Sequence, residues 1–133
     1  MLVDSHSHLF LEEFADDLPQ VMQRAREAGV THIFMPNIDS TTIESLLSVC
    51  AAYKEFCFPM IGLHPTSVNK NYKKELDIVA GQLASSNGYV AIGEIGLDYH
   101  WDEPEPELQK AWFVRQLGLA REKKLPVIIH SRD

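Results

Sequence analysis

Long apolar segments and paired cysteines are missing from this chain. Its apolar runs are all far shorter than the ~20 residues that a membrane-spanning helix needs. The N-terminus has neither the basic start nor the long apolar stretch of a secretory signal. Its two cysteines, Cys50 and Cys57, each lie in an apolar segment, which favours buried thiols over a disulfide or a metal-binding pair. These absences predict a cytoplasmic protein that does not contact the membrane.

Positive charge is also scarce. Asp and Glu number 19 against 12 Lys and Arg, so the formal net charge is −7. General nucleic-acid-binding modules usually present a basic patch or stripe, and the charge balance argues against that class. It does not argue against a nuclease, because bound divalent cations can supply local positive charge in a carboxylate-rich site. No GxGxxG or Walker-type glycine loop follows an apolar run, which weakens a nucleotide-binding interpretation.

What the chain does contain is a repeat in which a short apolar run precedes an amphipathic segment. The runs are rich in Val, Ile and Phe, which predicts buried strands beginning near Leu2, Val30, Phe56, Tyr89 and Pro126. The intervening segments have apolar residues at helical spacing. These stripes are Phe14, Leu18, Val21, Met22 and Ala25; Ile43, Leu46, Leu47 and Cys50; Leu76, Val79, Ala80 and Leu83; and Leu108, Trp112, Phe113, Leu117 and Ala120. Such α/β alternation predicts a parallel sheet, either open and doubly wound or the first part of a TIM-type (β/α) barrel.

Residues typical of helix ends support these boundaries. Asp39 and Ser40 are suited to cap the second predicted helix. Pro104 and Pro106 suit the opening of the fourth helix, and Gly29 follows the first helix where a C-terminal glycine is expected.

Polar residues follow the apolar runs, at the carboxyl ends of the predicted strands. His6, His8, Glu94 and His130 all occupy such positions, and reactive side chains of parallel α/β folds gather at this edge. Strand alternation places His6 and His8 on the same side. Imidazole and carboxylate ligands suit Zn, Mn or Fe, and a carboxylate can bridge two ions. Glu94 could instead cap a helix and His130 could be a core residue, but the joint pattern predicts a metal site.

With these motifs the chain resembles the TatD family of metal-dependent deoxyribonucleases, within the amidohydrolase-like barrels. The resemblance covers the whole chain and implies that residues 1–133 are the N-terminal part of a single (β/α)8 barrel domain, apparently truncated, because family members are about twice as long. The matching segments are Asp4-Ser5-His6-Ser7-His8-Leu9, Gly62-Leu63-His64-Pro65, Gly93-Glu94-Ile95-Gly96-Leu97-Asp98-Tyr99 and Ile129-His130-Ser131-Arg132-Asp133.

The resemblance also implies roles for individual residues. His6 and His8 would bind one divalent ion, His130 a second, and Glu94 would bridge both; the ions would be Mg, Mn or Zn. Water activated by the two ions would attack a DNA phosphodiester. Glu94 and His64 would be catalytic, with His64 near the substrate phosphate or a water. The family's second half supplies a further His and a late Asp, so the chain is expected to pair with that half or self-associate.

Three points stay open at this stage. Arg132 is expected to reach a phosphate. Tyr99, with His100 and Trp101, could stack on a nucleobase or pack against a neighbouring loop, and Asp98 could orient a histidine or bind the loop backbone. As alternatives to a deoxyribonuclease, the chain could belong to an amidohydrolase-like enzyme that acts on an amide, lactone or nucleobase, or be an inactive metal-binding fragment.

Overall fold

Five strands and four α-helices alternate along the described part of the chain. The structure is a computed structural model that describes residues 1–69, 72–85, 87–101 and 105–133. The strands are β1 (Leu2–Asp4), β2 (Val30–Pro36), β3 (Cys57–Ile61), β4 (Ala91–Asp98) and β5 (Val127–Arg132). The helices are α1 (Leu18–Glu27), α2 (Ile43–Ala52), α3 (Tyr72–Ala84) and α4 (Pro106–Lys123), with 3-10 turns η1 (Glu12–Phe14), η2 (Ser40–Thr42) and η3 (Pro65–Ser67). None of the described helices has the length and apolar character required to cross a membrane.

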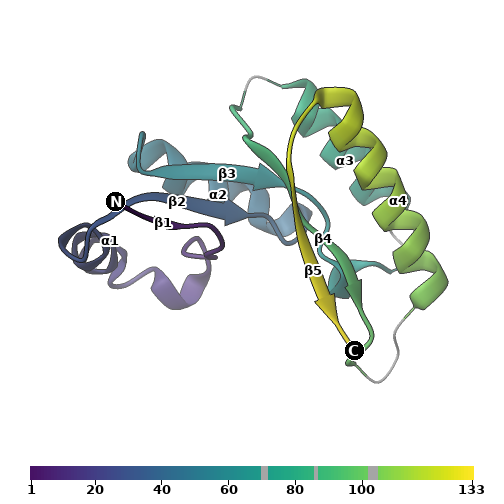
Figure 1. Cartoon of the computed structure of the whole chain (residues 1–133), viewed down its shortest axis with the longest axis horizontal. Coiled ribbons are helices and arrows are strands. Elements are labelled where there is room, and N and C mark those ends of the chain that lie inside the picture. The colour runs from purple at the N-terminus through teal and green to yellow at the C-terminus, as the bar shows by residue number, and fades with distance from the viewer. Residues whose placement is uncertain (70–71, 86, 102–104) are drawn as a thin grey trace.

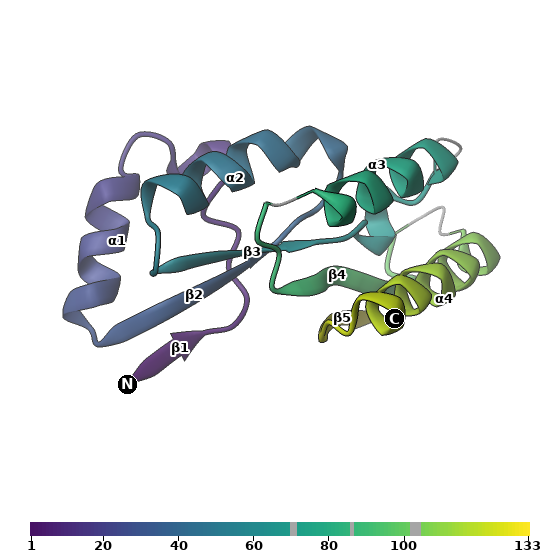
Figure 2. The ribbon, with the colours of Figure 1, turned by 90° about the horizontal axis from the view of Figure 1, so that it is seen from above.

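The order of the strands decides between the two predicted architectures. All four strand pairs are parallel, and the sheet runs β1-β2-β3-β4-β5 in sequence order (Figure 1). A doubly wound sheet reverses its strand order at a switch point, whereas the described strands show no reversal. The helices follow one another around the outside of the curved sheet (Figure 2). The chain therefore forms a half-barrel, as the barrel interpretation predicts.

The helices cover the outer side of the sheet with the apolar stripes that the sequence predicts, with one exception. Met22 and Leu46 are fully buried in one cluster of the core, and Val79 is buried in another. Leu117, predicted on the buried stripe of α4, is instead 37% exposed. The buried face of α4 consists of Gln109, Trp112, Gln116 and Ala120.

Two glutamines determine which face of α4 is buried. The side-chain oxygen of Gln116 accepts from the backbone N–H of Leu63 at 2.7 Å, and its amide nitrogen donates to the Leu63 carbonyl at 3.2 Å. Gln109 makes the same pair of bonds to the backbone of Asp98, at 2.8 and 2.9 Å. Because buried backbone groups must find partners, these bonds turn the two glutamines inward and Leu117 outward. They also fix α4 against the ends of two strands.

The predicted helix ends are mostly confirmed. Gly29 follows α1 with φ 90°, a conformation that favours glycine. Asp39 accepts from the backbone N–H of Thr41 and so caps η2, the short turn that leads into α2, rather than α2 itself. Pro106 begins α4, and Pro104 lies outside the described residues.

Both cysteines are free and buried, as the sequence predicts. Burial raises the pKa of the Cys50 thiol to about 12 and that of Cys57 to about 11. The two side chains therefore stay protonated at neutral pH and contribute to the core rather than to metal binding.

Candidate metal centre

The carboxylate of Glu94 lies at the centre of a group of histidines. It projects from β4, and its side chain is only 4% exposed. One oxygen, Oε2, is 3.0 Å from Nε2 of His6 and 3.4 Å from Nε2 of His8. The other, Oε1, is 2.8 Å from Nδ1 of His130 and 3.5 Å from Nε2 of His64. Each oxygen thus faces its own pair of imidazoles, and each resulting trio has its ligand atoms within 4.8 Å of one another, close enough to hold a metal ion.

A glycine allows β4 and β5 to bring Glu94 and His130 together. Gly96 pairs with His130 in the β4–β5 register, beyond an irregularity in β4 between Ile92 and Ile95. Its φ is 148°, and a Cβ atom built there would collide with the backbone carbonyl of His130. Only glycine fits this close approach without a shift of one of the strands.

His6 and His8 reach Glu94 by a different route from the one predicted. Strand alternation was expected to place them on one side, but β1 ends at Asp4, before either histidine. The segment that follows is held against β2 by a hydrogen bond of 3.1 Å from the backbone N–H of Ser7 to the carbonyl of Phe34. Both imidazoles nevertheless lie against the same carboxylate oxygen.

The hydrogen bonds of His8 and His130 indicate which ring nitrogens are free to bind a cation. Nδ1 of His8 lies 3.1 Å from the carbonyl of Pro36, and Nε2 of His130 lies 2.8 Å from Oδ2 of Asp98. Both partners only accept, so these nitrogens carry the protons. When these two rings are neutral, the other nitrogen of each ring carries a lone pair that faces the Glu94 carboxylate. Two acceptors in such contact require a cation or a proton between them, and the donor set therefore fits a divalent metal.

In His64 the protonated nitrogen, not the lone pair, faces the carboxylate. The backbone N–H of Thr66 donates to Nδ1 of His64 at 3.2 Å, so the proton of the neutral ring is on Nε2, the nitrogen that faces Glu94. The ring packs edge-on against His130, with centroids 4.5 Å apart. His64 is therefore in contact with the carboxylate, but as a hydrogen-bond donor rather than a free lone pair.

Glu94 remains ionised in this setting. Burial works to raise its pKa. In the metal-free protein, where protons on the imidazoles take the place of the cation, the hydrogen bonds from His64 and His8 and the charges of His64 and His6 outweigh burial and hold the pKa of Glu94 below its ordinary value. A permanently charged carboxylate is the form that binds metal.

Asp98 connects His130 to the rest of this strand end. Its Oδ2 accepts from His130 and, at 2.8 Å, from Nη2 of Arg132, while Oδ1 accepts from the backbone N–H of His100 at 3.1 Å. Burial acts to raise the pKa of Asp98, but the bonds to Arg132, His100 and His130 lower it to about 2. Both roles left open by the sequence are therefore present, since Asp98 orients a histidine and binds the loop backbone.

The comparisons with known proteins agree with this geometry. Residues 3–133 match the family model described as TatD related DNase. The chain belongs to this family. It is 38% identical over its whole length to an uncharacterized metal-dependent hydrolase, YabD, of Bacillus subtilis (strain 168), and covers 51% of that protein. It is 34% identical over 132 residues to the 3'-5' ssDNA/RNA exonuclease TatD of Erwinia tasmaniensis, covering 99% of this chain and 51% of the relative.

A solved TatD-family structure has the same fold. The crystal structure of the TatD homologue YjjV from Escherichia coli K12 superposes with a TM-score of 0.90 at 34% identity, over 98% of this chain and 51% of the other. The chain spans about half the length of the curated relatives it matches.

We expect Asp98→Asn to weaken metal binding in this TatD-family centre by about 10- to 100-fold, the usual effect of losing a partner that orients a ligand histidine. Asparagine has one acceptor oxygen where aspartate has two. With that oxygen toward His130 and Arg132, its NH2 group opposes the backbone N–H of His100; with the amide turned the other way, nothing accepts from His130 and its tautomer is no longer fixed. Calorimetric titration with Mn²⁺ measures the change. Asp77→Asn, an exposed substitution on α3, is the matched control, and equal affinity in both variants would contradict the orienting role.

Besides His64, two residues predicted to contact substrate lie at the ends of β4 and β5. Arg132 directs both Nε and Nη2 at Asp98, at 3.1 and 2.8 Å from Oδ2, so one edge of its guanidinium is already engaged. Tyr99 is half-buried, and its hydroxyl is buried without a hydrogen-bond partner in the described part of the chain. Trp101, two residues further along the chain, is 57% exposed.

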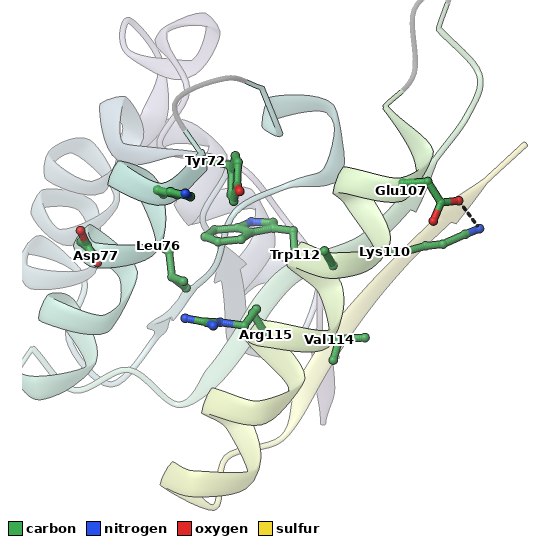
Figure 3. Close-up of a pocket in the computed structure, with 10 residues that line it drawn as sticks. Tyr72, Leu76, Asp77, Glu107, Lys110, Trp112, Val114 and Arg115 are labelled. Atoms are coloured by element: carbon green, nitrogen blue, oxygen red, sulfur yellow. Dashed lines mark hydrogen bonds and ion pairs between the residues drawn. The ribbon is translucent and has the colours of Figure 1, made fainter.

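A wide groove between α3 and α4 lies apart from the metal centre. It encloses about 780 Å³ and is lined by Tyr72, Leu76, Trp112 and Arg115, among others (Figure 3). The buried indole N–H of Trp112 has no partner among the described residues. The residues that line the groove include none of the histidines around Glu94. We therefore do not place the catalytic site in this groove, although it is large.

Sequence reasoning missed the contacts that set the histidine tautomers. The carbonyl of Pro36 and the N–H of Thr66 belong to the backbone, so no residue type marks their roles. The contact between His64 and Glu94 depends on how closely β3 and β4 approach, which motif spacing does not give. The role of Asp98 could be anticipated, because Asp98 ends the same strand as Glu94 and pairs with Arg132 of the neighbouring strand.

Proposed function

We propose that this chain supplies the metal-binding half of the active site of a nuclease that removes nucleotides from the 3' end of single-stranded DNA or RNA. The observation that carries the proposal is the Glu94 carboxylate, whose two oxygens each face a separate pair of histidines. This arrangement suits two ions held close together, which is the usual arrangement for hydrolysis of phosphate esters. The polarity and the substrate come from the name of the TatD relative.

The proposed roles follow from the contacts. His6 and His8 with Oε2 of Glu94 would hold one divalent ion, and His130 with Oε1 would hold another. When bound, Mg²⁺, Mn²⁺ or Zn²⁺ would neutralise the phosphodiester and activate water for attack on phosphorus. His64 carries a proton on Nε2 beside Oε1 and would donate it in a hydrogen bond to a phosphate oxygen. Arg132, held by Asp98, would present its remaining edge to the substrate backbone.

In this proposal residues 1–133 are the N-terminal part of a single barrel domain, and the remaining ligands come from the half that the relatives have in addition. The net charge of −7 is compatible with a nucleic-acid substrate, because the bound cations supply the local attraction.

The direct test is digestion of a single-stranded oligonucleotide labelled at its 5' end, by the protein as its gene encodes it, with added Mg²⁺ or Mn²⁺. We expect a ladder of products shortened from the 3' end, lost on chelation of the metal. The same oligonucleotide in a blunt duplex is the control and should be degraded far more slowly. Absence of cleavage with either ion, or cleavage at internal positions alone, would overturn the proposal.

A further inference from the structure

We propose that Trp101 forms a stacking site for one nucleobase beside the metal centre. The inference rests on the proposed function, because the bound ring is taken to be a base of a nucleic-acid substrate. It adds a contact with that base, which the metal centre does not provide. Four features of the strand end after β4 support it: the exposure of Trp101, its fixed orientation, the hollow beside it, and the connection of that hollow to Glu94.

Trp101 is exposed in a way that packing does not explain. The chain has two tryptophans; Trp112 is 2% exposed in the core, whereas Trp101 is 57% exposed at the surface. Large aromatic side chains lose much apolar contact when left in water. Tyr99, another residue that could stack, is half-buried with its hydroxyl enclosed, so its ring is less accessible to a ligand than that of Trp101.

The orientation of the Trp101 ring is supported by fixed neighbours. The guanidinium of Arg132 lies over the ring, 5.2 Å from its centroid. Arg132 is itself held by Nε and Nη2 to the buried carboxylate of Asp98. The ring of His100 also packs against that of Trp101 in a T-shaped arrangement, with centroids 5.2 Å apart. These contacts order the ring while much of it stays exposed, and an already ordered ring loses little conformational entropy on binding.

A small hollow lies against Trp101. It encloses about 200 Å³, below the ~300 Å³ of the smallest typical ligand pockets, so it suits one ring system rather than a whole nucleotide. Its lining comes from η3, the end of β4 and the start of α4: Pro65, Thr66, Val68, Asp98, Trp101, Glu105 and Gln109.

Two residues that line the hollow, Thr66 and Asp98, also hold histidines of the metal centre. Thr66 bonds to Nδ1 of His64, and Asp98 bonds to Nε2 of His130. Both imidazoles contact Glu94. The hollow thus adjoins the residues around Glu94, which is where the proposal places the phosphate of a nucleotide whose base lies against Trp101. Base–aromatic stacking tolerates any sequence because every base has a π-face, which suits an enzyme that degrades a strand progressively.

The test is binding of a phosphorothioate oligothymidylate, which resists cleavage, compared with the same oligonucleotide lacking its 3'-terminal base. Both are titrated in Mg²⁺ into the protein as its gene encodes it. Subtracting the emission of Trp101→Phe, in which Trp112 remains, isolates the signal of Trp101. We expect the complete oligonucleotide to quench Trp101 and to bind about tenfold more tightly than the abasic one, within the range that stacking of one base provides. Trp101→Ala should lose this preference, and Val114→Ala, an exposed apolar residue on α4, should keep it.

The outcomes separate this inference from the proposed function. Equal binding of the two oligonucleotides by the unmodified protein, or no quenching of Trp101, would overturn the stacking site even if cleavage is efficient. A base preference that depends on Trp101, without cleavage of unmodified DNA or RNA, would uphold the stacking site and overturn the nuclease proposal. If Trp101→Ala does not fold, the stacking site is still tested by the binding of the complete and the abasic oligonucleotide to the unmodified protein.

Discussion

In the protein as its gene encodes it, replacing Glu94 with Gln will lower the proposed metal-dependent phosphodiester hydrolysis by at least about a hundredfold, more than the loss of an outer partner of a metal ligand usually costs. The substitution keeps the size of the side chain but removes the charge that faces both histidine pairs. An amide has one good acceptor oxygen, so it cannot bind a cation on each side as a carboxylate does. The fold should be retained, because without metal the amide can still hydrogen bond with the neighbouring imidazoles.

The measurements are kcat on a single-stranded oligonucleotide, metal content after dialysis, and thermal unfolding of the metal-free protein. Glu107→Gln is the matched control, since its side chain is 87% exposed on α4 and its loss removes the same charge at a distance from the site. Turnover equal to that of the control at saturating Mn²⁺ would show that Glu94 does not bridge two ions. If the metal-free Glu94→Gln variant shows no unfolding transition, the carboxylate is needed for the stability of the fold.

The strands and helices could be predicted from the sequence because each is a local pattern. Short runs rich in β-branched residues between helical stripes identify β2 (Val30–Pro36) and α2 (Ile43–Ala52) to within a few residues. The choice between a half-barrel and a doubly wound sheet depends on which strands pair, and that is a property of the whole chain. Leu117 shows the same limit, since the buried face of α4 is set by Gln109 and Gln116 bonding to distant backbone groups.

The candidate site could be predicted only as far as strand ends locate it. Glu94 and His130 lie at the ends of neighbouring parallel strands, and their contact follows from that topology. The convergence of His6 and His8 was predicted for a partly wrong reason, because the chain leaves β1 before reaching them. The donor role of His64 could not be predicted, since it depends on which of its nitrogens accepts from the backbone.

A polypeptide limited to residues 1–133 will self-associate and have negligible nuclease activity by itself. Among the described strands, β1 and β5 each have only one neighbour, so both present unpaired backbone groups. Apolar side chains accompany these edges: Leu2 and Ile129 are each 56% exposed and Val3 is 47% exposed. Five strands do not close a barrel of eight. The exposed edges can be covered by a second copy or by the other half of the domain that the relatives have.

Sedimentation velocity at several concentrations, combined with a metal-dependent DNA cleavage assay, tests both parts of this prediction. Ile129→Lys places a charge at the β5 edge and should weaken association, because edge lysines oppose strand pairing. Val114→Lys makes the same change at a residue 66% exposed on the outer side of α4 and should leave association unchanged. The half-barrel would instead be an independent enzyme if residues 1–133 sediment as a monodisperse monomer and cleave DNA rapidly, with that cleavage abolished by His6→Ala.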